Sequence, residues 1–234
     1  MSEHAGAPAA VLHARITETL GLDIISGVLA PGDRLTLEGL QQEFGVSRTV
    51  VRDCMRILES MNLVYSKRRI GIVVQKPELW NVFDPRVIQW RLAGPGRSEQ
   101  FRTLTELRVG VEPVAAAAAA RNAAQEERTR LVELAGELRL LGEAGELDGF
   151  LQADIEFHTL LLRASGNDMF ASLQEAVAEV LTGRTRQGLM PPHPTEEGLR
   201  SHGLVAAAIA AGDGAAALAH MTELLEEVRQ AVVG

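Results

Sequence analysis

The chain has 234 residues, of which 46% are hydrophobic and 4% aromatic, with a formal net charge of −8 at pH 7. This length allows two modest domains, and a composition poor in aromatics and rich in alanine favours packed helices. No apolar run approaches the roughly 20 residues that span a bilayer, and the start, MSEHAGAPAA, lacks the basic and apolar parts of a signal peptide. The single cysteine, Cys54, excludes an internal disulfide, so we expect a cytoplasmic protein with no membrane partner.

The first predicted elements follow a tail over 1–10 that we expect to be disordered. A helix is predicted over 11–26, where apolar residues recur at intervals of four. A second helix, over about 36–44, ends at Gly45, and Ser47 is placed to cap a third. Helix, short turn, helix is the spacing of a helix-turn-helix motif.

The third helix has two distinct faces. Val51, Met55 and Leu58 recur at helical spacing and would face a core. Arg48 and Arg52 fall on the opposite face near the helix N-terminus, which suits a helix that reads a DNA groove. The same pattern fits an amphipathic helix with solvated arginines, and this stretch alone does not separate the two readings.

After the third helix the pattern changes to that of strands. Residues 63–66 and 71–74 are strand-like, a basic tip lies between them at 67–69, and Gly71 is placed where a hairpin would turn. Such a hairpin after a helix-turn-helix is typical of a DNA-binding wing, and a solvated loop is the alternative.

The distribution of charge supports a nucleic-acid partner for the first part of the chain only. Residues 1–76 hold 9 Lys and Arg against 8 Asp and Glu, whereas the remainder holds 14 against 23. Phosphate contacts need a basic surface locally, not a basic protein. We therefore predict a winged helix-turn-helix DNA-binding domain over 11–76.

The rest of the chain is predicted to be helical. Residues 77–97 form a linker, in which Trp80, Phe83 and Trp90 are expected to pin the chain against a domain. Helices are expected at about 99–121, 125–142, 146–165, 168–188, 195–212 and 214–232. The predicted fold class is mainly α, with an all-α helical bundle over 98–234 after the winged domain.

Two sets of residues carry a resemblance to a known family. They are Gly27–Leu35, Phe44–Arg52, Arg69 and Gly71 in the first half, and 106–108, 112–115, 153–158, 165–167, His202 and 208–213 in the second. With them the chain resembles the GntR family of bacterial transcription regulators, and within it the FadR-like subfamily, whose second domain is the all-helical FCD domain. Asn81–Ala93 is also similar to the linker of galactonate-type repressors.

The resemblance implies that the third helix and the wing bind operator DNA. In the family, the residues that match Arg48, Thr49, Arg52 and Gly71 contact the operator. We expect the DNA-binding residues to be Ser47, Arg48, Thr49, Arg52, Arg69 and Gly71.

Asp154 and His158 stand four residues apart, so both side chains project from one helix face and can share a divalent metal ion such as Zn or Ni. Such pairs also occur on helices that bind no metal. The resemblance implies that His202 is a further ligand. Metal-binding FCD domains usually offer another histidine at the position of Leu224, and His220 lies one helical turn earlier. We expect a three-ligand site that water or effector completes.

A buried arginine beside such a metal suits a small carboxylate with hydroxyls. Arg108 is the candidate, because a guanidinium binds a carboxylate in bidentate fashion, and an ion pair with Glu112 is the alternative. The orientation of Arg184 and Arg186 cannot be read from the sequence. The expected effector-binding residues are Arg108, Asp154, His158, His202 and His220. The effector is expected to be a sugar acid such as galactonate or gluconate, with lactate, another organic acid or an amino acid as the alternative.

A metal-dependent enzyme fused to a DNA-binding module is the rival from another class. A metallohydrolase needs a general base beside its metal, and the sequence shows neither that pattern nor a Ser or Cys nucleophile motif. We therefore expect no enzyme, but a homodimeric repressor whose C-terminal domain binds the effector and dimerises, and whose two recognition helices read operator half-sites.

Overall fold

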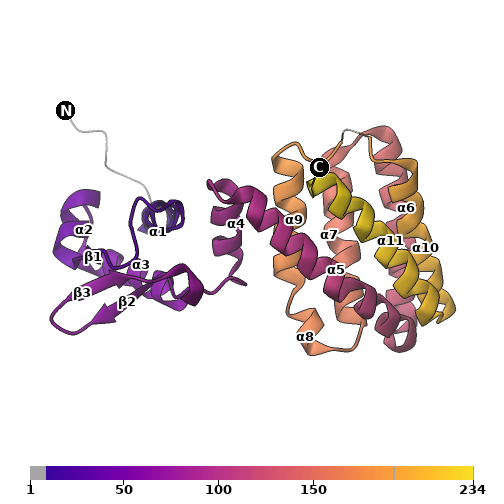
Figure 1. Ribbon diagram of the computed structural model, residues 1–234, viewed down its shortest axis with the longest axis horizontal. Coiled ribbons are helices and arrows are strands. Elements are labelled where there is room, and N and C mark those ends of the chain that lie inside the picture. Colours follow the sequence, from indigo (N-terminus) through magenta and orange to yellow (C-terminus); the bar gives the residue numbers. More distant parts are fainter. Residues whose placement is uncertain (1–8, 192, 234) are drawn as a thin grey trace. The chain divides into compact units, whose positions relative to one another are not determined.

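A computed structural model describes residues 9–191 and 193–233. The chain divides into two compact units, and the boundary along the sequence falls between Arg97 and Ser98 (Figure 1). Most of the predicted tail lies outside the described residues, but Ala9 and Ala10 already belong to the first helix. Each unit has its own hydrophobic core.

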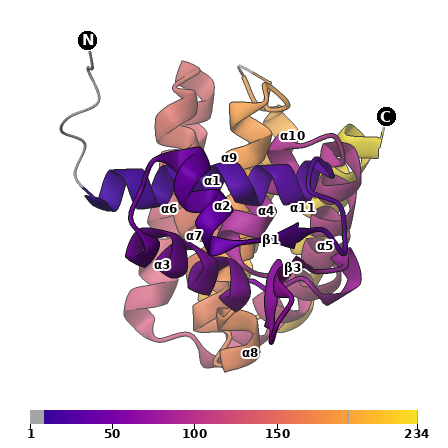
Figure 2. The same cartoon turned by 90° about the vertical axis from the view of Figure 1, so that its left-hand side faces the viewer.

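Three helices of the first unit form the predicted helix-turn-helix and its support (Figure 2). They are α1 (Ala9–Ser26), α2 (Leu37–Phe44) and α3 (Arg48–Ser60), and both α1 and α2 pack on α3. Gly45 ends α2 in the left-handed conformation, at φ +63°, where a side chain would be strained. Ser47 caps α3, because its side chain accepts a hydrogen bond from the Val50 N–H at 3.4 Å.

A three-stranded antiparallel sheet completes the winged domain. Its strands are β1 (Arg34–Leu35), β2 (Val64–Lys67) and β3 (Gly71–Val74), in the order β1-β3-β2. Lys67 pairs with Gly71, so the wing turns at residues 68–70 and Gly71 already begins the returning strand. Gly71 has φ +104°, and a Cβ there would lie 2.9 Å from the Leu35 carbonyl oxygen of β1. The two-residue β1 was not predicted, because it is too short to show alternation.

The segment predicted as a linker is largely ordered on the first unit. It contains the 3-10 helix η1 (Pro77–Leu79) and α4 (Pro85–Ala93), which Asp84 caps. The ring of Trp90 is buried against Gly21 of α1, where a Cβ would lie 2.3 Å from the indole, whereas Phe83 is 52% exposed and does not pin the chain as expected. Only glycine at position 21 therefore allows α4 to approach α1 this closely.

The second unit is a bundle of helices. These are α5 (Arg97–Asn122), α6 (Gln125–Ala144), α7 (Leu147–Ala164), α8 (Asp168–Ala171), α9 (Gln174–Arg186), α10 (Glu196–Ala211) and α11 (Gly214–Val233). The predicted single helix over 168–188 is divided into α8 and α9. At the division, the Ser172 hydroxyl donates to the Met169 carbonyl at 2.8 Å, a local bond that competes with regular helix.

Within this bundle α7 packs on both α6 and α9, and α10 packs on α6 and α11. Phe157 of α7 is fully buried, as are Ala115, Ala116 and Ala119 of α5. Among the described residues, no helix is both long and apolar enough to cross a bilayer. The predicted fold class is confirmed: a winged helix-turn-helix domain precedes an all-α bundle.

Candidate functional site

A concave surface between α3 and the wing, here called the basic groove, has a volume of about 520 Å³. Its basic side chains are Arg48, Arg52, Arg56, Lys67, Arg68 and Arg69, and its acidic ones are Glu38 and Glu59. All the basic residues are exposed. This excess of positive charge on an acidic protein suits a phosphate backbone.

The structure brings together most of the residues predicted to bind DNA. Arg48, Arg52, Arg69 and Gly71 line the basic groove, whereas Ser47 and Thr49 are exposed at the first turn of α3 outside its lining. The sequence prediction left out Arg56, although its spacing of four residues from Arg52 places both on one helix face.

An acidic residue also lies in the basic groove. Glu38 Oε1 of α2 lies 3.3 Å from Arg48 Nη1, and both side chains are more than 60% exposed. An ion pair this exposed is weak, because water screens both charges, so Arg48 can leave Glu38 for a phosphate or a base.

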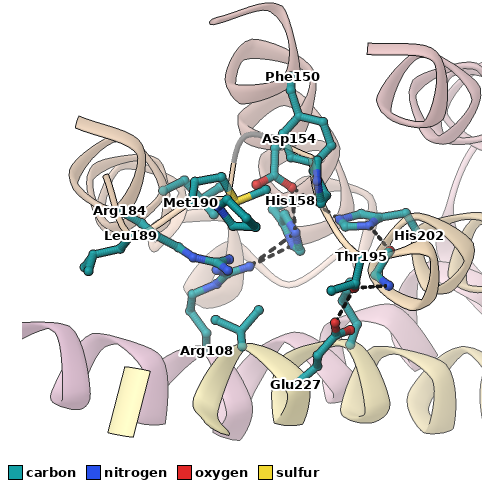
Figure 3. Close-up of a pocket in the computed structure, with 16 residues that line it drawn as sticks. Arg108, Phe150, Asp154, His158, Arg184, Leu189, Met190, Thr195, His202 and Glu227 are labelled. Atoms are coloured by element: carbon teal, nitrogen blue, oxygen red, sulfur yellow. Dashed lines mark hydrogen bonds and ion pairs between the residues drawn. The ribbon is translucent and has the colours of Figure 1, made fainter. Parts of the chain in front are cut away.

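Three side chains of the second unit converge on one point and are here called the Asp154 cluster. Asp154 and His158 come from α7 and His202 from α10, and all three are buried (Figure 3). Asp154 Oδ1 lies 3.3 Å from His158 Nε2 and 3.3 Å from His202 Nε2. One ligand atom from each lies within 4.8 Å of the other two.

The second nitrogen of each imidazole fixes its orientation. His202 Nδ1 lies 2.8 Å from the Gly198 carbonyl oxygen, to which it donates, and His158 Nδ1 donates to Glu112 Oε2 at 2.7 Å. Both Nε2 atoms are therefore turned toward Asp154. This is how metal-binding histidines are usually held, and 3.3 Å is a reasonable separation for two ligands with bonds of about 2.1 Å to one ion. The donor set thus fits a divalent metal.

A buried ion pair supports this cluster from α5. Arg108 Nε lies 2.6 Å from Glu112 Oε1, and the two residues are 3% and 0% exposed. Arg108 Nη2 lies 3.2 and 3.3 Å from the two ring nitrogens of His158. Because it is nearly equidistant from both, it points along neither lone pair and leaves Nε2 accessible.

Burial and charge act in opposite directions on these groups. Burial raises the pKa of Glu112, but Arg108 and His158 outweigh it and lower the pKa to about 2. Burial likewise raises the pKa of Asp154, but the hydrogen bonds with His158 and His202 outweigh burial and hold this pKa well below its usual range. Burial lowers the pKa of His158, but the charge of Glu112 raises it overall. Without a metal, a proton on His158 therefore balances the carboxylates, and a metal ion would displace it.

The Asp154 cluster opens into a cavity of about 140 Å³, here called the α7 pocket. Its further lining residues include Arg108, Phe150, Leu181, Arg184, Leu189, Met190, Thr195, Gly198, Leu224, Glu227 and Val228. This volume is close to the roughly 150 Å³ of an engineered cavity that holds benzene, so a small organic molecule fits. The pocket is thus large enough for a small organic molecule, and polar groups from several helices converge on it.

Arg184 is a pocket residue whose orientation the sequence could not give. Its guanidinium points into the α7 pocket (Figure 3), and no carboxylate of the described residues lies within ion-pair distance of it. Burial lowers the pKa of Arg184, and Asp154 partly opposes this. The sequence did contain an indication of this orientation, because Arg184 continues the helical stripe of Val177, Val180 and Leu181, which are buried. Arg186 is exposed.

His220 lies elsewhere on α11. Its Nδ1 is 3.2 Å from Glu223 Oε2, and it does not line the α7 pocket. Leu224, at the position where metal-binding FCD domains usually have a histidine, forms part of the pocket wall. Of the residues predicted to bind effector, the structure therefore gathers Arg108, Asp154, His158 and His202, and leaves His220 out.

Comparisons with known proteins agree with both units. The model of the FCD domain matches residues 103–227, and the model of the bacterial regulatory proteins of the gntR family matches residues 12–74. Among solved structures, Escherichia coli McbR/YncC has a TM-score of 0.52 and 20% identity, and the match covers 95% of this chain and 97% of that one. At this identity the likeness shows the fold.

Curated relatives are transcription regulators. The galactonate operon transcriptional repressor of Escherichia coli is 31% identical over 167 residues, which cover 71% of this chain and 72% of the relative. LutR of Bacillus subtilis is 29% identical, covering 90% and 96% of the two chains. The Uxu operon regulator of Haemophilus influenzae is 32% identical, covering 70% of this chain and 58% of its own.

Proposed function

Because the chain belongs to the GntR family of bacterial transcription regulators and carries an FCD domain, we propose that it is a repressor whose affinity for its operator is controlled by a small carboxylate effector. It is a DNA-binding regulator and not an enzyme, and its relatives and fold neighbours are transcription regulators too. The observation that carries the proposal is the α7 pocket, where the Asp154 cluster and two arginines face one cavity.

The basic groove is the proposed operator surface. Arg48, Arg52 and Arg69 supply charge for phosphates and donors for base edges, with Ser47 and Thr49 at the exposed N-terminus of α3. Gly71 keeps the wing close to β1. The repressor acts as a homodimer, since two copies of α3 read two half-sites of a short palindrome.

Asp154, His158 and His202 would hold a divalent ion, Zn or Ni, in the proposed site. Because Leu224 offers no ligand, such an ion could act as a Lewis acid toward oxygen atoms of the effector. A carboxylate with a neighbouring hydroxyl suits such positions, and Arg184 lies in the same cavity to bind the carboxylate. Arg108 contributes from the wall, with its charge already balanced by Glu112.

A sugar acid such as galactonate or gluconate is the proposed effector. Two relatives are named as regulators of the galactonate and Uxu operons. The charged and polar groups set in the otherwise apolar wall of the cavity, Arg184, Glu227 and the Asp154 cluster among them, support an acid with hydroxyl groups. Lactate, another organic acid or an amino acid is the alternative. Effector binding biases the protein between states that differ in operator affinity.

A thermal-shift screen of the purified protein with sugar acids, lactate and amino acids tests the effector class. At 100 times its Kd a ligand stabilises the folded state by about 2.7 kcal/mol, so a true effector raises the melting temperature measurably. Metal content is measured in parallel on the wild type and on His158→Ala. No shift with any acid, or no stoichiometric metal in the wild type, would contradict the proposal.

Operator binding is tested with the double variant Arg48→Ala/Arg52→Ala, which is expected to lose binding while keeping the wild-type circular dichroism. The matched control, Arg15→Ala/Arg86→Ala, removes two exposed arginines of the same unit that do not line the basic groove. Equal loss in both variants would argue for a merely electrostatic effect and against the basic groove.

A further inference from the structure

The α7 pocket has a second polar end, away from the Asp154 cluster. Glu227 of α11 and Thr195, the cap of α10, line it. Figure 3 shows these two side chains joined to each other on the α11 side of the pocket, apart from Asp154. The pocket therefore offers a ligand two chemically different ends, one with the Arg184 guanidinium and one with the Glu227 carboxylate.

The Thr195–Glu227 pair leaves one acceptor unused. The Thr195 hydroxyl donates to Glu227 Oε1, and its oxygen accepts from the Gly198 N–H at 3.0 Å, so its proton is committed. Glu227 Oε2 receives no hydrogen bond from any residue that the structure describes. Since Glu227 is half-buried in the pocket wall, a hydroxyl of a bound molecule is a suitable donor.

Gly198 leaves space beside this acceptor. A Cβ at this position would lie 3.5 Å from Glu227 Oε2 and 3.2 Å from Thr195 Oγ1. Any side chain here would therefore occupy the surroundings of the unused oxygen. The absence of one keeps Glu227 Oε2 open to the cavity.

At the end of the pocket with the two arginines, one guanidinium can pair with a ligand carboxylate. The charge of Arg108 is balanced by Glu112 at 2.6 Å. Arg184 has no carboxylate within ion-pair distance among the described residues, although it lines the same cavity. Asp154 and Glu227 act on the charge of Arg184 only from beyond ion-pair distance, so a ligand carboxylate can pair with this guanidinium directly.

From this arrangement, and resting on the function proposed above, we infer that the effector is a polyhydroxy monocarboxylic acid, and that Glu227 excludes the corresponding dicarboxylic acid. The carboxylate lies toward Arg184 and the Asp154 cluster, and a distal hydroxyl donates to Glu227 Oε2. A second carboxylate in place of that hydroxyl meets the Glu227 carboxylate. Like charges brought together in this way weaken binding by about tenfold or more.

Calorimetric titration of the full chain with matched acids tests the inference. Gluconate and galactonate are compared with glucarate and galactarate, which differ in having a second carboxylate at the far carbon. The wild type is expected to bind the monocarboxylates at least about tenfold more tightly. Glu227→Gln, which keeps an acceptor for Thr195, is expected to bring the two classes within about threefold of each other by tightening the dicarboxylates.

The matched control is Glu223→Gln, which removes a charge from the same helix outside the α7 pocket. It is expected to retain the wild-type preference. Equal binding of both classes by the wild type, or an unchanged preference in Glu227→Gln, would overturn the role of Glu227 while leaving the effector class intact. Binding of neither class would overturn the proposed effector class and this inference with it.

Discussion

The buried pair Arg108–Glu112 allows the electrostatics of the α7 pocket to be tested by stability. Glu112→Gln removes a negative charge at a residue that is 0% exposed and leaves Arg108 buried without its partner 2.6 Å away. Breaking a buried pair from one side costs about 3–5 kcal/mol. With about 2–4 °C per kcal/mol in a chain of this size, the melting temperature should fall by roughly 10 °C.

A double-variant cycle separates the pair from the substitution itself. Arg108→Met/Glu112→Gln removes both charges. Its loss in free energy of unfolding should therefore be smaller, by about 2 kcal/mol, than the summed losses of the two single variants. Urea unfolding is followed by far-UV circular dichroism in the presence of EDTA, so that a bound metal does not contribute to stability.

The same helix offers a matched control. Arg102 and Glu106 have the same spacing of four residues and the same N–O distance of 2.6 Å, but their side chains are 44% and 55% exposed. Solvent screens this pair, so its cycle should show a much smaller coupling. Equal coupling at the two pairs, or additive effects at Arg108 and Glu112, would refute the reasoning.

Three further predictions concern the two binding surfaces. Glu38→Gln removes the acidic partner of Arg48, so the affinity for operator DNA should rise severalfold when it is measured by fluorescence anisotropy. The gain should shrink at high salt, and an unchanged affinity would contradict the prediction. Asp154→Asn should lose stoichiometric metal by elemental analysis, whereas the exposed Asp148→Asn of the same helix should keep it. Arg184→Gln should weaken acid binding by about 10–100-fold in calorimetry, while Arg186→Gln should not; similar effects would remove Arg184 from the site.

The winged domain was predictable from the sequence because its signals are local. Gly45 and Ser47 mark the turn between two helices by their own backbone and side-chain preferences, and the structure has both in these roles. A local signal also existed for α4, where Asp84 and Pro85 form a helix start. The packing of Trp90 on Gly21 joins residues far apart in the chain, so no periodicity could indicate it.

The α7 pocket was predictable only in part. Asp154 and His158 share a helix face by their spacing, whereas His202 required the resemblance, since it comes from another helix. The alternatives for Arg108 were both open in the sequence, and the structure has it paired with Glu112 while it lines the pocket. Which face of α9 meets α7, and which face of α11 lines the α7 pocket, depends on packing, so Arg184 and Glu227 could not be oriented beforehand.

The wall that α11 gives to the α7 pocket ties these findings together. Leu224 stands where metal-binding FCD domains usually have a histidine, and Glu227 follows three residues later on the same helix face. An apolar side chain there offers no metal ligand, so a metal ion held by the Asp154 cluster would have to take its remaining ligands from the effector or water. In the complex we propose, Glu227 would contact the opposite end of that effector, and α11 would then contribute selectivity for the ligand in place of affinity for the metal.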